Sequence, residues 1–461
     1  MMKTLPDGPK TPKLLQQLHW LVDPMSYLEG VAQKPYRDFF KPEPLGLGPS
    51  PLFISHPKAL QQIFTDTKSF TAPGDLNQIF RPFIGDYALV CLSGKSHRRQ
   101  RQLLTPPLHG DRMAVYGELI CNHASSAFEQ LKMSQTFLAH TTMQEIAQKV
   151  ILKVLFGIRQ EEQTERLRKC VKNLSDIFNH PLNYIWMFFP VLQRDLGPLT
   201  SWGHFYRERE KVDEIIYGEI RERRSSPDDS RTDILSLLMA ARDEEGQPMS
   251  DVEIRDQLMN LLIAGNETSA TGMSLALYWI HNMPEVREKL LAELDTLEGN
   301  FDPATIVKLP YLSAVCNEVL RINPIAITLM PRLVQEEVEL LGYSLPPGTL
   351  LIPCAYLTHQ REDLYPEPKK FKPERFLERK YYNYEFLGFG GGSRRCVGNA
   401  FAMYEMKLVL ATILSKYKLE LVEQKPIKLQ RRGLNITPVG GVKMVLKGQR
   451  SRQETPVAAT V

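Results

Sequence analysis

Phe389-Gly-Gly-Gly-Ser-Arg-Arg-Cys-Val-Gly398 is the stretch that decides the fold, because it carries the spacing F-x-x-G-x-R-x-C-x-G. Its glycines, Gly390 to Gly392, permit positive φ and let the backbone approach a flat cofactor closely. Cys396 lies where the loop becomes a helix, and the amide dipoles there favour a thiolate. A lone cysteine is usually a packing residue. A lone triple glycine suits a phosphate loop, but no Gly-Lys-Ser/Thr follows. The combined spacing of Phe, Gly, Arg, Cys and Gly is much more specific than either part alone.

A long helix is expected upstream of this loop, from about Asp251 to Asn282. Ser250 and Glu253 form a capping-box pattern at its start, and Pro284 marks its end. Such a helix exceeds the usual length in globular proteins, so we expect it to cross the molecule.

The rest of the chain reads as mainly α with a minor β part. The predicted helices are 115–241 (mostly helical), 311–322 and 397–415, and the predicted strands are 51–55 and 88–92. Turns at Gly342 and at 346–348 predict a small sheet between the last two helices. The length of 461 residues allows two or three domains or one large one.

The composition excludes several classes of protein. With 43% hydrophobic and 24% charged residues, the chain is neither collagenous nor wholly disordered. The net charge of +4 gives no case for nucleic acid, although basic groups gather at 95–101 and after residue 425. The six cysteines form no CxxC motif and imply no disulfide framework. No apolar run reaches membrane-spanning length, so we expect a cytoplasmic protein with no integral span, and peripheral membrane contact stays open.

Four further motifs carry chemistry. In Ala264-Gly-Asn-Glu-Thr-Ser269, a Thr hydroxyl bonded back to the carbonyl four residues earlier bends a helix, and an acid beside it suits proton transfer. Glu318 and Arg321 are neighbours on a helix face, as are His97 and Arg101. Arg332 follows the apolar run 324–331. Each motif alone is more often structural or surface charge.

Together these motifs resemble the cytochrome P-450 superfamily of haem-thiolate monooxygenases, over nearly the whole chain. The resemblance implies a haem b cofactor with Cys396 as iron ligand, Phe389 beside the sulfur, and a long central helix over the haem. It implies further haem contacts from Gly390, Gly398, Ala264 and Gly265, and propionate partners in Arg394, His97, Arg101 and Arg332. It makes Thr268 and Glu267 the proton-delivery pair, and it joins Glu318 and Arg321 to Arg375 in a network that supports the haem loop.

The resemblance also places the substrate chamber. Its expected walls are Ala264, Phe80, Phe83, Trp186, Met187, Phe188, Ile325, Ala326, Thr328, Ile436 and Thr437. For any one of these, packing in an ordinary core is an equal alternative. Together they indicate a small, largely apolar substrate such as a fatty acid or terpenoid.

No flavin or nicotinamide fingerprint accompanies the motifs, so electrons are expected from a separate ferredoxin or flavodoxin with its reductase. Arg98, Arg99, Arg395 and Lys407 are the expected basic docking face. The proline-rich opening without an anchor favours a soluble bacterial or cyanobacterial member. The predicted organisation is an N-terminal segment 1–30, one haem domain 31–448 and a flexible tail 449–461. A peroxide-driven peroxygenase and a non-catalytic haem sensor or carrier remain alternatives.

Overall fold

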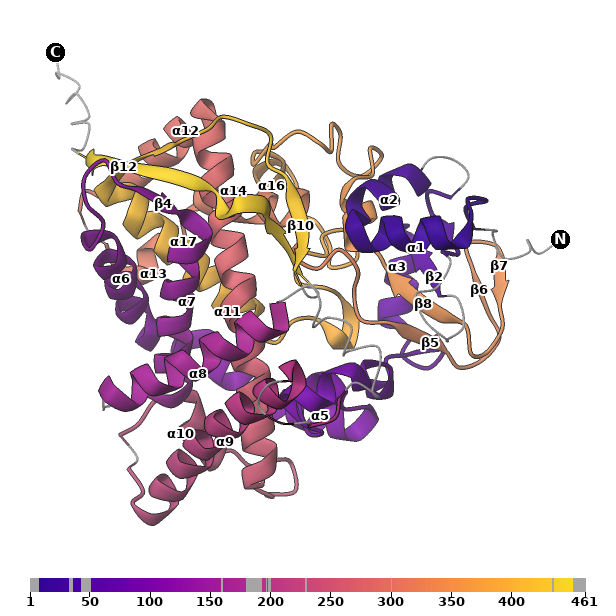
Figure 1. Ribbon diagram of the computed structural model, residues 1–461. Helices are drawn as coiled ribbons and strands as arrows, with labels where there is room; N and C mark the ends of the chain where they lie inside the picture. Colours follow the sequence, from indigo (N-terminus) through magenta and orange to yellow (C-terminus); the bar gives the residue numbers. More distant parts are fainter. Residues whose placement is uncertain are drawn as a thin grey trace.

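The predicted long helix is present as α11 (Asp251–Asn282) and runs through the middle of the computed structural model (Figure 1). Its start is closed by both bonds of the capping box: Glu253 N donates to Ser250 Oγ at 3.2 Å, and Ser250 N donates to Glu253 Oε2 at 2.8 Å. At about 1.5 Å per residue the helix is about 48 Å long. The structure describes residues 8–32, 36–42, 51–158, 161–179, 193–195, 197, 200–228, 230–299, 301–432 and 435–450.

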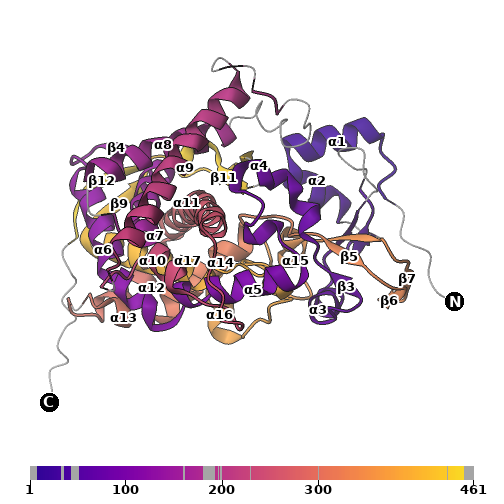
Figure 2. The same cartoon turned by 90° about the horizontal axis from the view of Figure 1, so that it is seen from below.

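Helices pack around α11 on most sides, as the end-on view in Figure 2 shows. The α-helices before it are α1 (Lys13–Val22), α2 (Pro24–Val31), α3 (Pro57–Thr65), α4 (Arg81–Ile84), α5 (Gly94–Leu104), α6 (Ala114–Glu129), α7 (Ala139–Phe156), α8 (Glu161–Asn179), α9 (Ser201–Ser225) and α10 (Ile234–Ala240). Those after it are α12 (Pro284–Asp295), α13 (Pro303–Ile306), α14 (Pro310–Ile322), α15 (Ala355–His359), α16 (Arg375–Glu378) and α17 (Asn399–Lys416). Short 3-10 helices are η1 (Gly74–Phe80), η2 (Leu89–Cys91), η3 (Pro106–Leu108), η4 (Gly110–Met113), η7 (Gly392–Arg394) and η8 (Val439–Gly441).

The β part consists of small sheets. Five strands pair in the order β1-β2-β8-β5-β3. Among the described residues only β2 and β8 are parallel neighbours in this sheet. The sheet lies with α1–α3 at the end of the molecule that carries the N-terminus (Figures 1 and 2). Three more strands pair as β4-β12-β9, and β6–β7 and β10–β11 are hairpins. The bounds are β1 (Phe39–Phe40), β2 (Leu52–Ile54), β3 (Phe70–Thr71), β4 (Thr136–Leu138), β5 (Arg332–Val334), β6 (Val338–Leu340), β7 (Tyr343–Leu345), β8 (Leu350–Pro353), β9 (Tyr417–Leu421), β10 (Leu429–Arg432), β11 (Asn435–Pro438) and β12 (Lys443–Gln449).

The mainly helical fold class with small sheets is confirmed, and one detail differs from the sequence predictions. The apolar run 88–92 is not a strand: it contains η2, because a short apolar run satisfies a buried turn as well as a strand. The predicted domain division at residues 30 and 448 stays a prediction. Residue 30 lies within α2, β12 continues to Gln449, and Arg450 forms an ion pair with Asp295 at 2.5 Å. Residues 451–461 lie outside the described residues.

Candidate active site

The loop before α17 is shaped to present a sulfur atom. Gly390 and Gly392 have φ of +73° and +62°, a region in which L side chains are strained. A Cβ atom on Gly391 would stand 2.2 Å from the Phe64 ring of α3, so only glycine fits there. Cys396 N donates to Phe389 O at 2.9 Å, and the Gly398 N–H donates to the Cys396 sulfur. These bonds fix the direction of the thiol.

Cys396 is the exposed one of the six cysteines, and the other five are buried or half-buried. Ala264, midway along α11, is exposed as well, although most residues of this helix are buried. Desolvation by the surrounding protein raises the pKa of the Cys396 thiol, while the Gly398 N–H and the charges of Arg101 and Arg395 oppose this rise. The predicted backbone support for a thiolate is present, and the desolvation outweighs it.

Positive charge gathers beside this loop. Arg332 is buried and donates to Gly391 O at 3.0 Å. Arg394 donates to Leu89 O at 3.1 Å and to Leu92 O at 2.5 Å, and Arg101 donates to Arg395 O at 2.7 Å. In the described part of the chain, none of these three guanidinium groups forms an ion pair with a carboxylate.

The electrostatics show that this cluster lacks a counter-charge. Burial and the neighbouring Arg394 lower the pKa of Arg332 to about 10, and burial and Arg101 lower that of Arg394 to about 10. Burial and the charges of Arg394, Arg101 and Arg332 lower the pKa of His97 to about 4, which also places these four side chains close together. An anionic group with two carboxylates supplies the missing charge. The residues present therefore fit the two propionates of haem.

Thr268 has the predicted back-bonded geometry: its Oγ1 donates to Ala264 O at 2.6 Å. Glu267 is buried, and its carboxylate contacts side chains of α7 and β10. Gln144 of α7 donates to its Oε2 at 2.8 Å, and His140 Nε2 of α7 lies 3.3 Å from its Oε1. Arg432 of β10 stands 3.5 Å from the same oxygen. Three side chains from outside α11 therefore position this carboxylate.

Gly265 is explained by helix packing. A Cβ atom there would lie 3.2 Å from Ile151 Cδ1 of α7, so the missing side chain allows α11 and α7 to approach each other closely. The exposed small residue of this turn is Ala264.

Glu318, Arg321 and Arg375 form a buried network. Arg321 donates to both carboxylate oxygens of Glu318, at 2.6 and 2.8 Å, and Arg375 Nε donates to Oε1 at 3.1 Å. His359 connects this network to the cysteine loop, the segment 387–398 that carries Cys396. Its Nε2 accepts from Leu387 N at 2.8 Å, and its Nδ1 lies 2.9 Å from Arg321 O. Because Nε2 is an acceptor, Nδ1 carries the proton and the ring is neutral.

The expected substrate residues divide into two groups. Ala326 is exposed and Phe80, Ile325 and Thr328 are half-buried, whereas Ile436 and Thr437 are buried. Ile436 N donates to Ile325 O at 2.9 Å, so segments 325–328 and 436–437 lie side by side.

Phe83 is buried against Trp202 and Phe205 of α9, with ring centroids 6.1 and 4.9 Å away, and is a core residue. Its assignment to the chamber wall stays a prediction, as it does for the buried Ile436 and Thr437. Trp186, Met187 and Phe188 lie outside the described residues.

The expected basic docking face needs a correction at two of its four positions. Arg99 is paired with Asp243 at 2.5 Å and with Glu253 at 2.7 Å, which neutralises its charge. Lys407 donates to Val307 O at 2.8 Å, and burial lowers the pKa of its amine. Arg98 is exposed and Arg395 is half-buried.

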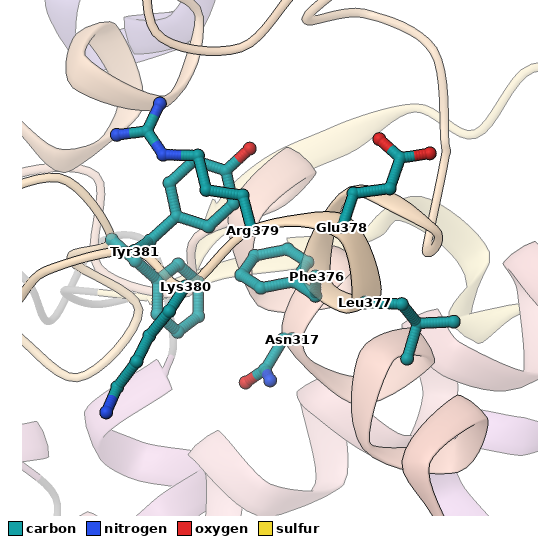
Figure 3. Close-up of a pocket in the computed structure, with 8 residues that line it drawn as sticks. Asn317, Phe376, Leu377, Glu378, Arg379, Lys380 and Tyr381 are labelled. Carbon is teal, nitrogen blue, oxygen red and sulfur yellow. The ribbon is translucent and has the colours of Figure 1, made fainter.

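A surface pocket of about 320 Å³ lies between α14 and the segment after α16 (Figure 3). Arg379, Lys380 and Tyr381 line it together with Asn317. None of the residues predicted to contact cofactor, oxygen or substrate lines this pocket, so it is separate from the site at Cys396.

Sequence reasoning missed the partners of Glu267 and the bridging role of His359. His140 and Gln144 precede Glu267 by more than 120 residues, and Arg432 follows it by 165. No local spacing links such positions. The one sequence signal was the basic stretch after residue 425, which contains Arg432.

Comparisons with known proteins agree with this geometry. The family model described as Cytochrome P450 matches residues 23–443. A putative cytochrome P450 135B1 of Mycobacterium tuberculosis is 31% identical over 455 residues, which cover 98% of this chain and 94% of that protein. Retinoic acid-bound cyanobacterial CYP120A1 has a TM-score of 0.81 at 24% identity and covers 97% of this chain and 100% of its own. A cytochrome P450DA heme domain has a TM-score of 0.84 at 20% identity and covers 98% of both chains.

Proposed function

The chain belongs to the cytochrome P450 family of haem-thiolate monooxygenases, and we propose that it oxidises a largely apolar substrate, such as a fatty acid or terpenoid, with electrons from a separate protein. The observation that carries the assignment of the site is the exposed Cys396 beside a cluster of cations that form no ion pair with any carboxylate the structure describes. A bound haem with thiolate ligation supplies reductive activation of dioxygen. The residues of this chain then have three tasks: to hold the cofactor, to move protons and to enclose the substrate.

Cys396 is the proposed ligand, and four side chains hold the propionates. The cluster already binds main-chain carbonyls: Arg332 and Arg101 donate to the cysteine loop, and Arg394 donates to Ala72 O and Leu89 O. His97 lies among these three cations. Carboxylates that arrive among them gain charge-assisted hydrogen bonds and relieve the repulsion between the cations. Phe389, Gly390 and Gly398 shape the loop around the sulfur.

Thr268 and Glu267 are the proposed proton-delivery pair. The Thr268 hydroxyl is held by Ala264 O, and its oxygen keeps lone pairs that accept a proton donor. Glu267 Oε2 is anchored by Gln144, whereas the buried Oε1 has no well-formed hydrogen bond within the described residues. Oε1 is the oxygen that we assign to proton exchange, and its charged or titratable neighbours are His140 Nε2 at 3.3 Å and Arg432 Nη1 at 3.5 Å.

A first experiment tests the ligand. The reduced, carbon monoxide-bound protein is expected to show the strongly red-shifted Soret band of a thiolate-ligated haem, and Cys396→Ser is expected to lose it. A Cys396→Ser protein that binds haem and keeps the band would overturn the assignment of Cys396.

A second experiment tests the proton pair. In Thr268→Ala and Glu267→Gln, we expect reductant and oxygen to be consumed with more peroxide released and less product formed. Ser274→Ala is the matched control, since Ser274 Oγ is likewise bonded to a carbonyl of α11, that of Thr271 at 3.0 Å. Equal peroxide release in all three variants would contradict the proposed roles.

The same assay separates the alternatives. A monooxygenase forms product with reductant and oxygen, a peroxygenase forms it with peroxide alone, and a haem sensor or carrier forms none. The Glu267–Thr268 pair favours the first. Substrate class is tested by a screen of fatty acids and terpenoids, read as a shift in haem spin state.

An acidic ferredoxin or flavodoxin is the proposed electron donor, with Arg98 and Arg395 as the remaining members of the docking face. Reduction rates are expected to fall as salt rises. Arg98→Glu should slow reduction, and Arg99→Glu should slow it mainly by disturbing the pairs with Asp243 and Glu253. Reduction that is independent of salt would contradict this face.

A further inference from the structure

Helix α1 (Lys13–Val22) exposes large apolar side chains and buries the polar Gln16, which is the reverse of an ordinary surface helix. Its exposed side carries five large apolar residues: Leu14 (66% exposed), Leu15 (58%), Leu18 (49%), Leu21 (41%) and Val22 (77%). The spacing of i, i+1, i+4, i+7 and i+8 places them on one face. Scattered apolar residues on a surface are ordinary, but a continuous face of this kind marks an interaction site.

Specific contacts hold the helix in this orientation. Gln16 is only 3% exposed, and its Nε2 donates to Pro9 O and to Thr11 O, each at 2.8 Å. Tyr27 donates to Gln16 Oε1 at 3.1 Å. Trp20 packs edge-on against Tyr27 and Phe53, with centroids 5.8 and 5.6 Å apart. A polar side chain is thus satisfied inside while the leucines face outward.

The segment that carries this face is basic. From Gly8 to Val22 it contains Lys10 and Lys13 and no acidic residue, and Asp7 and Asp23 flank it. Arg431 of β10 lies over the Trp20 ring, 4.7 Å from its centroid. Of the acids that follow, Asp23 caps α2 by accepting from Ser26 N at 3.1 Å, and Glu29 is paired with Lys369 at 2.9 Å and accepts from Tyr356. An apolar face with a cationic rim matches the surface of an anionic bilayer.

We propose that α1 seats the protein on an anionic phospholipid membrane, with the apolar face of α1 (Leu14, Leu15, Leu18, Leu21 and Val22) in contact with the lipid. The ten-residue helix is about 15 Å long, half of the hydrocarbon thickness, so it lies in the interface and does not span it. No helix in the described parts of the chain is long and apolar enough to cross a bilayer. The contact is therefore peripheral.

The geometry links this surface to the candidate site. α1 contacts β10, and β10 pairs with β11, where Arg431 is opposite Ile436 and Gln430 is opposite Thr437. A membrane on α1 would therefore lie beside the hairpin that carries two of the proposed substrate residues. The binding itself depends only on α1 and its rim, so it stands or fails separately from the proposed reaction.

Vesicle flotation with the full-length holoprotein tests the proposal. We expect the protein to float with vesicles that contain phosphatidylglycerol, to float less as salt rises, and to bind poorly to pure phosphatidylcholine. The triple variant Leu14→Ser, Leu18→Ser, Leu21→Ser should bind about ten-fold or more weakly. Lys10→Gln with Lys13→Gln should weaken binding to the anionic vesicles alone.

The matched control is the triple variant Val115→Ser, Leu377→Ser, Val422→Ser, whose apolar side chains are 55%, 50% and 45% exposed on other elements. It should bind like the parent, and the haem spectra of all variants should be unchanged because the altered side chains are exposed. Equal vesicle binding by both triple variants, or none by the parent, would overturn the proposal. A parent that forms dimers dispersed only by the α1 variant, without binding vesicles, would also overturn it and assign the face to a second copy.

Discussion

Glu318→Gln should be among the most costly single substitutions in this protein. The carboxylate is fully buried and holds four donors: Arg321 Nε and Nη2 at 2.6 and 2.8 Å, Arg375 Nε at 3.1 Å and Lys372 N at 2.8 Å. Glutamine keeps the shape but places an NH₂ group against guanidinium N–H groups, and it leaves two buried cations without a counter-charge. Breaking a buried pair from one side costs about 3–5 kcal/mol.

That loss is a large share of a typical unfolding free energy of about 5–15 kcal/mol, and it lowers the folded-to-unfolded ratio by about two to four orders of magnitude. Because His359 joins the network to Leu387 at the start of the cysteine loop, haem incorporation should fall as well. The assay is denaturant unfolding of the apoprotein followed by circular dichroism, together with the ratio of haem to protein after expression.

Glu165→Gln on α8 is the matched control. Glu165 also accepts two bonds from an arginine three residues away, at 2.6 Å each, but its carboxylate is 45% exposed. An exposed pair of this kind is worth about 0–1 kcal/mol. If Glu318→Gln shifts unfolding no more than Glu165→Gln and keeps a normal haem content, burial is not what makes the network matter, and the reasoning fails.

Three further outcomes are expected. Burial raises the pKa of Glu405 to about 8, although a hydrogen bond with Ser269 opposes the rise, so the folded state keeps a proton that the unfolded chain loses above about 4.5. Stability should therefore fall as pH rises from 4.5 to 8, and Glu405→Gln should remove this loss in unfolding measured at pH 5 and pH 8. Burial and the charge of Arg321 lower the pKa of His359 to about 3, so on acidification the unfolded chain takes up a proton before the folded chain does. Stability should therefore decline as pH falls from 6.5 towards 3. If the stability of His359→Gln declines as steeply over this range, His359 is not the cause. Arg332→Met should release haem to a scavenger protein about 10–100-fold faster, because a charge-assisted hydrogen bond is lost, and an unchanged release rate would exclude Arg332 as a propionate partner.

The predictable parts of the fold had strong local signals. The ends of α11 match the prediction because Ser250 and Glu253 lie at its first turn and Pro284 lies two residues after its last residue. The shape of the cysteine loop was equally accessible, since its glycines and Cys396 are close together in sequence. Residues 88–92 lacked such a signal: five apolar residues suit a strand or a buried turn, and packing decided for η2.

The sequence named residues for the candidate site, whose roles stay predictions, but it did not indicate their contacts. Lys407 and Arg99 carry the same formal charge as Arg98, and only tertiary structure shows that Lys407 is half-buried and bonded to Val307 O and that Arg99 is paired with Asp243. Likewise, the motif predicted an acid at Glu267, whereas His140 comes from a helix far away in sequence. Pairings between distant elements depend on packing, which a local pattern does not encode.

The single exposed thiol has a practical consequence for following cofactor loading. Cys91, Cys170, Cys316 and Cys354 are buried, so an alkylating reagent finds one exposed sulfur, at Cys396, and a half-buried one at Cys121, although desolvation raises the pKa of the Cys396 thiol as well. With Cys396 as the proposed ligand, the extent of labelling there, read by peptide mass spectrometry, is expected to report the fraction of molecules that still lack the cofactor, and Cys121 serves as an internal standard. Chemical labelling of this one sulfur atom thereby measures cofactor loading without an absorption spectrum and without a substrate.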